Sequence, residues 1–213
     1  MATPSFPPVV LRNGVVVEDP LGAVLGLLTG PWHFDVSDPS HSASFGEADL
    51  RLANRGGARI SAAEIEAVLA RRGAIEPALR AIALDASLAQ GAGSVPWLPL
   101  RQLFDAFAGI RGIGFAKMTK TLHPKRPALI PLLDSVVRKY LQDDDLGVQA
   151  LFGERALELV RGYERDLARN GPALRAVRQE LARRDVRLTE VRILDLLIFS
   201  AVASSQITPI REL

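Results

Sequence analysis

The pattern of apolar and polar residues predicts a chain that is mainly helical after residue 46. Apolar residues recur at three- and four-residue spacing over 97–108, which is typical of an amphipathic helix. Further helices are predicted over about 76–89, 149–169, 172–184 and 188–203. The last of these is apolar on nearly every side, which indicates a buried helix.

The first 46 residues have a different pattern. Asn13-Gly14 separates two valine-rich runs within residues 9–18, which predicts a short β-hairpin or an extended arm. Asp19-Pro20 then provides an N-cap and a first helical residue for a short helix to residue 28. Residues 31–46 are rich in turn formers. We expect 1–46 to be an N-terminal arm and loop that packs on a helical domain, 47–213, in one compact unit.

Within the helical domain, Ser61 and Glu64 have the spacing of a capping box, which predicts a helix that ends near residues 72–73. Residues 109–114 form a glycine-rich turn between two predicted helices. This helix–hairpin–helix covers about 98–122, and a further helix is predicted over 132–141.

Composition excludes several classes of protein and site. The 213 residues include no cysteine, so disulfides, thiol nucleophiles and cysteine-ligated zinc or iron–sulfur centres are excluded. The three histidines are scattered, and we expect no metal and no cofactor. The chain has neither an apolar run of 18 residues nor a signal-peptide pattern. We therefore expect a cytoplasmic protein without a membrane partner.

The positive charge is concentrated in one segment. Residues 109–142 hold all four lysines of the chain and have a net charge of +6, while the rest of the chain carries −4. Such a segment favours a polyanionic partner, nucleic acid first, although a solvated basic face is the alternative. The predicted DNA contacts are Arg111, Gly112, Gly114, Lys117, Lys120, Lys125 and Arg126.

The glycines of the turn have a physical purpose in this interpretation. They allow a positive φ and a close approach of the backbone to a ligand. Amide groups at the start of the second helix then face a phosphate oxygen. Lys117 and Lys120 share one face of that helix. An ordinary helical hairpin with a glycine turn remains the alternative.

The segment resembles the helix–hairpin–helix superfamily of DNA glycosylases, of the endonuclease III type, over about 45 residues. That family follows its hairpin with a helix, a loop, an apolar-Pro-apolar run and an essential aspartate. Here Ile130-Pro131-Leu132 precedes Asp134, which stands 20 residues after Gly114. The block KRPALIPLLDSVV also resembles an uncharacterised bacterial family of similar length. The implied fold is a glycosylase-like helical bundle.

The resemblance implies that Asp134 is the catalytic carboxylate of a monofunctional DNA glycosylase. A carboxylate near C1′ stabilises the oxocarbenium character of the sugar when the base leaves. The alternative is a helix N-terminal aspartate that only complements the helix dipole. Bifunctional members carry a lysine two residues after the second glycine, where this chain has Ala116. A β-lyase activity is therefore not expected.

Three functions stay open at this point. A glycosylase acting on duplex DNA with a damaged or modified base requires a base-sized pocket beside Asp134. A non-catalytic DNA-binding module predicts no such pocket, or a carboxylate already neutralised by Arg138 or another internal partner. A helical protein-interaction scaffold predicts a hairpin covered by other elements. Trp32, Phe34 and Trp97 are candidates to fill the gap left by a flipped base. The base, the protein partners and the oligomeric state are left open.

Overall fold

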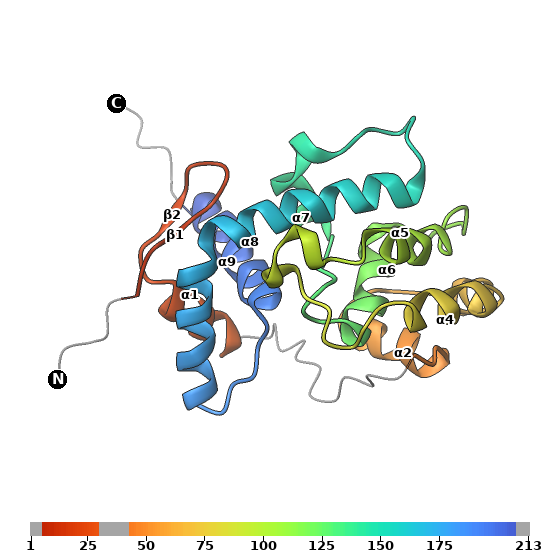
Figure 1. Ribbon diagram of the computed structural model, residues 1–213, viewed down its shortest axis with the longest axis horizontal. Helices are drawn as coiled ribbons and strands as arrows, with labels where there is room; N and C mark the ends of the chain where they lie inside the picture. The colour runs from red at the N-terminus through yellow and green to blue at the C-terminus, as the bar shows by residue number, and fades with distance from the viewer. Residues whose placement is uncertain (1–5, 30–42, 208–213) are drawn as a thin grey trace.

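The computed structural model describes residues 6–29 and 43–207, and over these ranges the protein is mainly α-helical with one small antiparallel hairpin (Figure 1). The helices are α1 (Pro20–Leu28), α2 (Glu47–Arg55), α3 (Ala62–Leu69), α4 (Arg72–Arg80), α5 (Trp97–Asp105), α6 (Phe115–Leu122), α7 (Ser135–Tyr140), α8 (Phe152–Arg183) and α9 (Glu190–Ile207). Four short 3-10 turns lie at Leu88–Gln90, Ala92–Ser94, His123–Lys125 and Gln142–Asp144.

The predicted N-terminal hairpin is present. Strand β1 (Val9–Val10) pairs in antiparallel register with β2 (Val16–Val17). Gly14 has φ +81°, a conformation that glycine adopts without steric cost. Asp19 caps α1 by accepting a hydrogen bond from the Gly22 amide at 2.8 Å, as the Asp-Pro pair predicts.

Arg12, between the two strands, ties the hairpin to the helical body. Its Nε donates to Asp166 of α8 at 2.7 Å, and a second guanidinium nitrogen pairs with Asp144. The same side chain donates to the Gly162 carbonyl at 2.5 Å. Because α1 packs on α9 and β1 packs on α8, residues near the two ends of the chain lie together.

The capping box of α3 is confirmed, since Ser61 Oγ accepts from the Glu64 amide and Glu64 accepts from the Ser61 amide. The boundaries after it were predicted wrongly. Helix α3 ends at Leu69, and α4 covers Arg72–Arg80 rather than 76–89. The C-terminal end of α4 has a tertiary cause, because the buried Arg126 guanidinium donates to the Leu79 and Ile82 carbonyl groups.

Two helices joined by a glycine turn form where the sequence predicts them. Helix α5 ends at Asp105, the turn contains Gly109 at φ +73° and Gly112 at φ +83°, and α6 begins at Phe115. The next helix was predicted over 132–141, but α7 begins at Ser135. The Leu132 and Leu133 amides do not begin a helix, because they donate to side chains of other helices.

The two helices predicted over 149–169 and 172–184 are one helix, α8, which continues through Gly171-Pro172. Proline removes one backbone hydrogen bond and bends a helix. Figure 1 shows α8 changing direction along its length. Buried residues on both sides of the proline, among them Leu167 and Leu174, hold the two halves in the core. Packing therefore outweighs the local cost of the proline.

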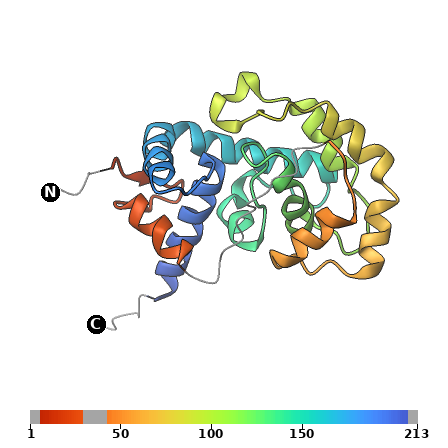
Figure 2. The same cartoon turned by 90° about the horizontal axis from the view of Figure 1, so that it is seen from below.

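The elements gather into two groups that are bridged by α8. The hairpin, α1 and α9 lie at one end of the molecule, and α2 to α6 lie at the other (Figures 1 and 2). One continuous cluster of buried apolar side chains runs through both groups. In the described part of the chain, no helix is long and apolar enough to cross a lipid bilayer.

Candidate functional site

Asp134 is the N-cap of α7. Its Oδ1 accepts hydrogen bonds from the amides of Val136 at 2.9 Å and Val137 at 3.0 Å. Arg138 pairs with Asp145 instead, at 3.6 Å. Among the residues that the structure describes, no lysine or arginine forms an ion pair with Asp134. The helix end therefore orients one carboxylate oxygen of Asp134. The ion pair with Arg138 that the binding-module hypothesis predicts is not formed.

Three side chains hold the loop that delivers Asp134. Thr119 Oγ1 of α6 accepts from the Leu133 amide at 3.0 Å. His123 Nδ1 lies 2.6 Å from the Ile130 carbonyl oxygen, and burial lowers the pKa of His123 to about 4. Asp195 of α9 accepts from the Leu132 amide at 3.4 Å. The apolar-Pro-apolar run is thus an extended segment clamped between α6 and α9.

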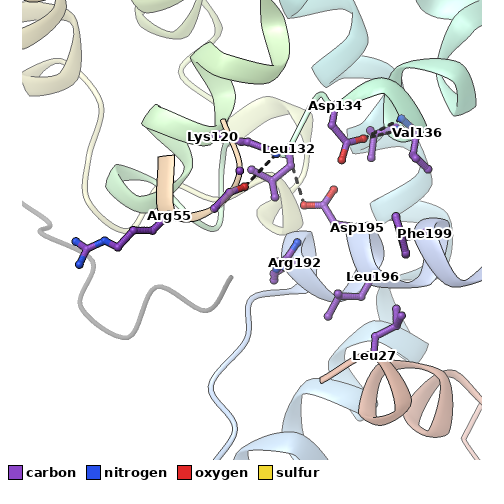
Figure 3. A pocket seen from close by; sticks show the side chains of 13 residues that line it. Leu27, Arg55, Lys120, Leu132, Asp134, Val136, Arg192, Asp195, Leu196 and Phe199 are labelled. Atoms are coloured by element: carbon purple, nitrogen blue, oxygen red, sulfur yellow. Dashed lines mark hydrogen bonds between the residues drawn. The ribbon is translucent and has the colours of Figure 1, made fainter. Parts of the chain in front are cut away.

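A cavity of about 310 Å³ lies beside Asp134. This volume is at the lower end of the range for small-molecule sites. Figure 3 shows α7 and α9 contributing carboxylates to it, while Leu27 of α1 closes the other side. The lining residues are Leu27, Arg55, Gly56, Gly57, Lys120, Leu132, Asp134, Val136, Val137, Arg192, Asp195, Leu196 and Phe199.

Asp195 is a second carboxyl group in this cavity, and sequence reasoning did not single it out. Its side chain lies next to that of Asp134 in Figure 3, and the residue is 4% exposed. The pKa of Asp195 is raised to about 7, chiefly by burial and in small part by the charge of Asp134, against the opposing influence of Arg192. The available signal was one acidic residue within the otherwise apolar helix segment VRILDLLIF.

The cavity also has cationic neighbours. Lys120 lines it and donates from Nζ to the Gly56 carbonyl at 3.1 Å, which places this predicted contact residue at the site. Arg192 lies one helical turn before Asp195 on α9. Arg55 lines the cavity too, but its guanidinium extends away from it (Figure 3). Two carboxyl groups and the basic residues Lys120 and Arg192 therefore border one largely apolar space.

The hairpin offers part of the surface that the sequence predicts. Arg111, Gly112 and Gly114 are exposed. Glu64 of α3 packs against Gly112 so closely that a β-carbon on that glycine would lie 2.0 Å from Oε1. Lys117 donates to both oxygens of Glu64, at 2.7 and 2.8 Å, and this hydrogen bond is the main cause that lowers the pKa of Glu64. An internal carboxylate thus sits where a phosphate was expected.

Lys125 and Arg126, two further predicted DNA contacts, are each 1% exposed. Lys125 Nζ lies 2.7 Å from Asp49 Oδ1. Arg126 donates to the carbonyls of Leu79, Ile82 and its own neighbour Lys125 at 2.7 Å in each case. These cations support the packing of α2 and α4, so we leave them out of the proposed nucleic-acid surface.

The predicted aromatic candidates do not line the cavity where they are described. Trp97 donates from its indole nitrogen to the Ala92 carbonyl at 2.9 Å, and Arg161 lies over its ring. Trp32 and Phe34 are outside the described residues. The aromatic side chain at the cavity is Phe199 of α9. Within the described ranges, no group of three or more metal-ligating side chains occurs.

Comparison with known proteins identifies one family. A family model described as "Family of unknown function (DUF6308)" matches residues 31–202, which is most of the chain. No curated protein and no solved structure matches the chain. The expectation of an uncharacterised family is thereby confirmed, whereas the resemblance to DNA glycosylases stays a prediction.

Proposed function

The chain belongs to DUF6308, a family of unknown function, and we propose from its cavity that it hydrolyses the base–sugar bond of a damaged or modified nucleotide in DNA. One observation carries the proposal. The carboxylate of Asp134 borders a cavity of about 310 Å³ without an ion-pair partner among the described residues. A glycosylase needs this combination of a carboxylate that can face the sugar and room for an extruded base.

In the proposed chemistry, backbone amides hold the Asp134 carboxylate in place and its charge acts on the sugar. The Val136 and Val137 amides hold Oδ1, so the group has one orientation. The C1′–N bond breaks with its electron pair passing to the base, and the ionised carboxylate stabilises the cationic sugar. Water then bonds to C1′ through its oxygen and releases a proton, while the base gains one. Ala116 occupies the position of the Schiff-base lysine in the bifunctional enzymes that the sequence resembles, which supports a monofunctional reaction.

The experiment compares the wild-type protein with Asp134→Asn on duplex oligonucleotides that each contain one modified base, followed by hot alkali to cleave abasic sites. Asparagine caps helices about as well as aspartate, so α7 is preserved. We expect the variant to lose about 10²-fold or more of the rate of base release, because the developing positive charge loses its counter-charge.

The exposed Asp85→Asn provides the matched control, because it removes the same charge away from the cavity and should release bases at the wild-type rate. Equal rates for Asp134→Asn and the wild type would overturn the proposal. So would the absence of base release across uracil, hypoxanthine, 7-methylguanine, ethenoadenine and 8-oxoguanine substrates.

A non-catalytic DNA-binding hairpin is the second candidate, and the exposed Arg111, Gly112 and Gly114 favour it. DNA held without base release, with an affinity that falls steeply as salt is raised, would support this candidate. A helical protein-interaction scaffold is the third, and the ion pair that already engages Lys117 with Glu64 favours it. Absence of any salt-sensitive DNA binding would favour the scaffold.

Glu64 provides a separate test of the hairpin surface. Replacing Glu64 with glutamine frees Lys117 from its ion pair and removes a negative charge beside Gly112. We expect duplex DNA to bind about 3- to 10-fold more tightly at low salt, with a log–log salt slope steeper by about one, because one more cation meets a phosphate. Fluorescence anisotropy with a labelled duplex measures both quantities.

The control for this test is Glu66→Gln, which removes an equal charge from an exposed position on the same helix. Equal affinities for the two variants would show that general charge, and not the release of Lys117, governs binding. That result would contradict a phosphate site at the hairpin.

A further inference from the structure

Asp195 shares the cavity with Asp134 but has a different environment. It comes from the second turn of α9, is 4% exposed, and contacts α8 and the loop before α7. Asp134 is half-buried and is held by backbone amides. Two carboxyl groups with such different surroundings are suited to different chemical roles.

The hydrogen bonds around Asp195 are consistent with a neutral carboxylic acid. The Tyr163 hydroxyl oxygen lies 2.6 Å from the Val191 carbonyl oxygen and 3.0 Å from Asp195 Oδ1. A tyrosine hydroxyl has one proton, and a carbonyl oxygen can only accept. When that proton serves the shorter contact to Val191, the contact to Asp195 requires a proton from the carboxyl group. The remaining oxygen accepts from the Leu132 amide.

The charged groups that face Asp195 come from four elements. Asp134 beside α7 favours the protonated form, whereas Arg192 on α9 favours the ionised form. Lys120 from α6 and Arg55 from α2 line the same cavity, although the latter extends outward. Burial is the largest influence on the pKa of Asp195, and it outweighs Arg192 and the hydrogen bonds with Tyr163 and Leu132, so that the pKa is raised to about 7.

We propose that Asp195 is the general acid that protonates the leaving base while Asp134 stabilises the sugar. This role rests on the proposed glycosylase function and specifies its substrates as bases that leave poorly without a proton. The Asp195 proton leaves its contact with the Tyr163 oxygen and passes to a base nitrogen as the C1′–N bond breaks. The water that bonds to C1′ releases the proton that returns Asp195 to its acid form, so the balance closes without a co-reactant.

The first test needs no substrate. In protein labelled with ¹³C at the aspartate carboxyl carbons, we expect one resonance to titrate near pH 7, to be missing in Asp195→Asn, and to titrate at lower pH in Asp134→Asn. The last shift follows because removal of the Asp134 charge makes ionisation of Asp195 easier. An Asp195 resonance that shows the carboxyl group already ionised at pH 5 would overturn the proposal, whatever the activity of the protein.

The second test compares two leaving bases in single-turnover reactions. Hypoxanthine in a duplex is neutral and leaves with difficulty, whereas 7-methylguanine already carries a positive charge and needs no proton. We expect Asp195→Asn to slow hypoxanthine release about 10²-fold and to leave 7-methylguanine release within about threefold. Asp134→Asn should slow both. The wild-type rate for hypoxanthine should fall above pH 7.

The outcomes separate the acid role from the glycosylase function. Equal slowing of both bases by Asp195→Asn assigns it a structural role and overturns the proposal, as does no slowing of either. Release of 7-methylguanine alone by the wild type retains the glycosylase and removes the acid. If hypoxanthine alone is released, the pH profile decides, and a rate that does not fall above pH 7 overturns the acid role. Release of neither base overturns the glycosylase function and the acid role together.

Discussion

Replacing Arg126 with methionine is expected to lower the free energy of unfolding by about 3–5 kcal/mol. The guanidinium is buried and donates to the carbonyl groups of Leu79, Ile82 and Lys125. Methionine fills part of the volume but donates no hydrogen bond, so three carbonyl groups lose the guanidinium as a donor. A buried acceptor that is left unpaired loses far more than a surface contact contributes. Urea unfolding followed by circular dichroism measures the difference.

Two further variants sharpen this prediction. Arg126→Lys retains a cation but not the planar fork, and we expect it to recover only part of the loss. Arg111→Met, at an exposed position in the hairpin, should change the stability by less than about 0.5 kcal/mol. An Arg126→Met protein as stable as the Arg111→Met protein would contradict the assignment of Arg126 to the core. It would also return Arg126 to the set of candidate DNA contacts.

Replacing Asp195 with asparagine is expected to stabilise the protein by about 2–4 kcal/mol at pH 8 and by little at pH 4. Burial raises the pKa of Asp195 from 3.8 to about 7 in the folded protein. The folded state therefore binds the proton more tightly than the unfolded state does. The stabilisation that the protonated Asp195 gives to the folded state is complete below about pH 4 and is lost as the pH rises through 7. Asparagine carries no charge to bury, and its amide can donate to the Tyr163 oxygen.

Thermal unfolding at pH 5 and pH 8 checks the sign of this effect. His123 acts in the opposite direction, because its lowered pKa makes the folded protein lose stability as the pH falls from about 6.5 toward 4. That contribution is common to both proteins and cancels in the difference between them. A stabilisation that is equal at the two pH values would contradict a protonated Asp195. A net loss of stability at pH 8 would contradict it as well.

These predictions concern the stability that the protein loses by burying a carboxyl group at the cavity. A buried carboxyl group that can be replaced with a gain in stability has a reason to be present other than packing. Loss of base release together with a gain in stability in Asp195→Asn would be the expected signature of a functional acid. Loss of both activity and stability would instead indicate a structural group.

The charge pattern of the sequence located the basic segment but could not sort its members. Lys117 and Lys125 form ion pairs with acidic residues of α3 and α2. Arg126 donates hydrogen bonds to carbonyl groups in α4 and just after it. Arg111 is exposed, and Lys120 reaches the cavity. Net charge is a sum over residues and does not tell which side chains face water. That information depends on which helices pack together.

The sequence by itself determined the elements whose hydrogen bonds are local. The Asn-Gly turn, the Asp19 cap, the Ser61 capping box and the glycine turn before α6 each form within a few residues, so their patterns predict them. The position of Asp134 after the apolar-Pro-apolar run was equally readable.

Only the tertiary structure decided the rest. It carried α8 through Pro172, delayed the start of α7 to Ser135, and placed Asp195 against a loop 63 residues earlier in the chain. The physical reason is common to all three. A local turn or cap is stabilised by neighbours in sequence, whereas a buried amide or carboxyl group takes its partner from whichever helix the core brings beside it. The second carboxyl group of the cavity therefore becomes visible only when α6, α7 and α9 are packed together.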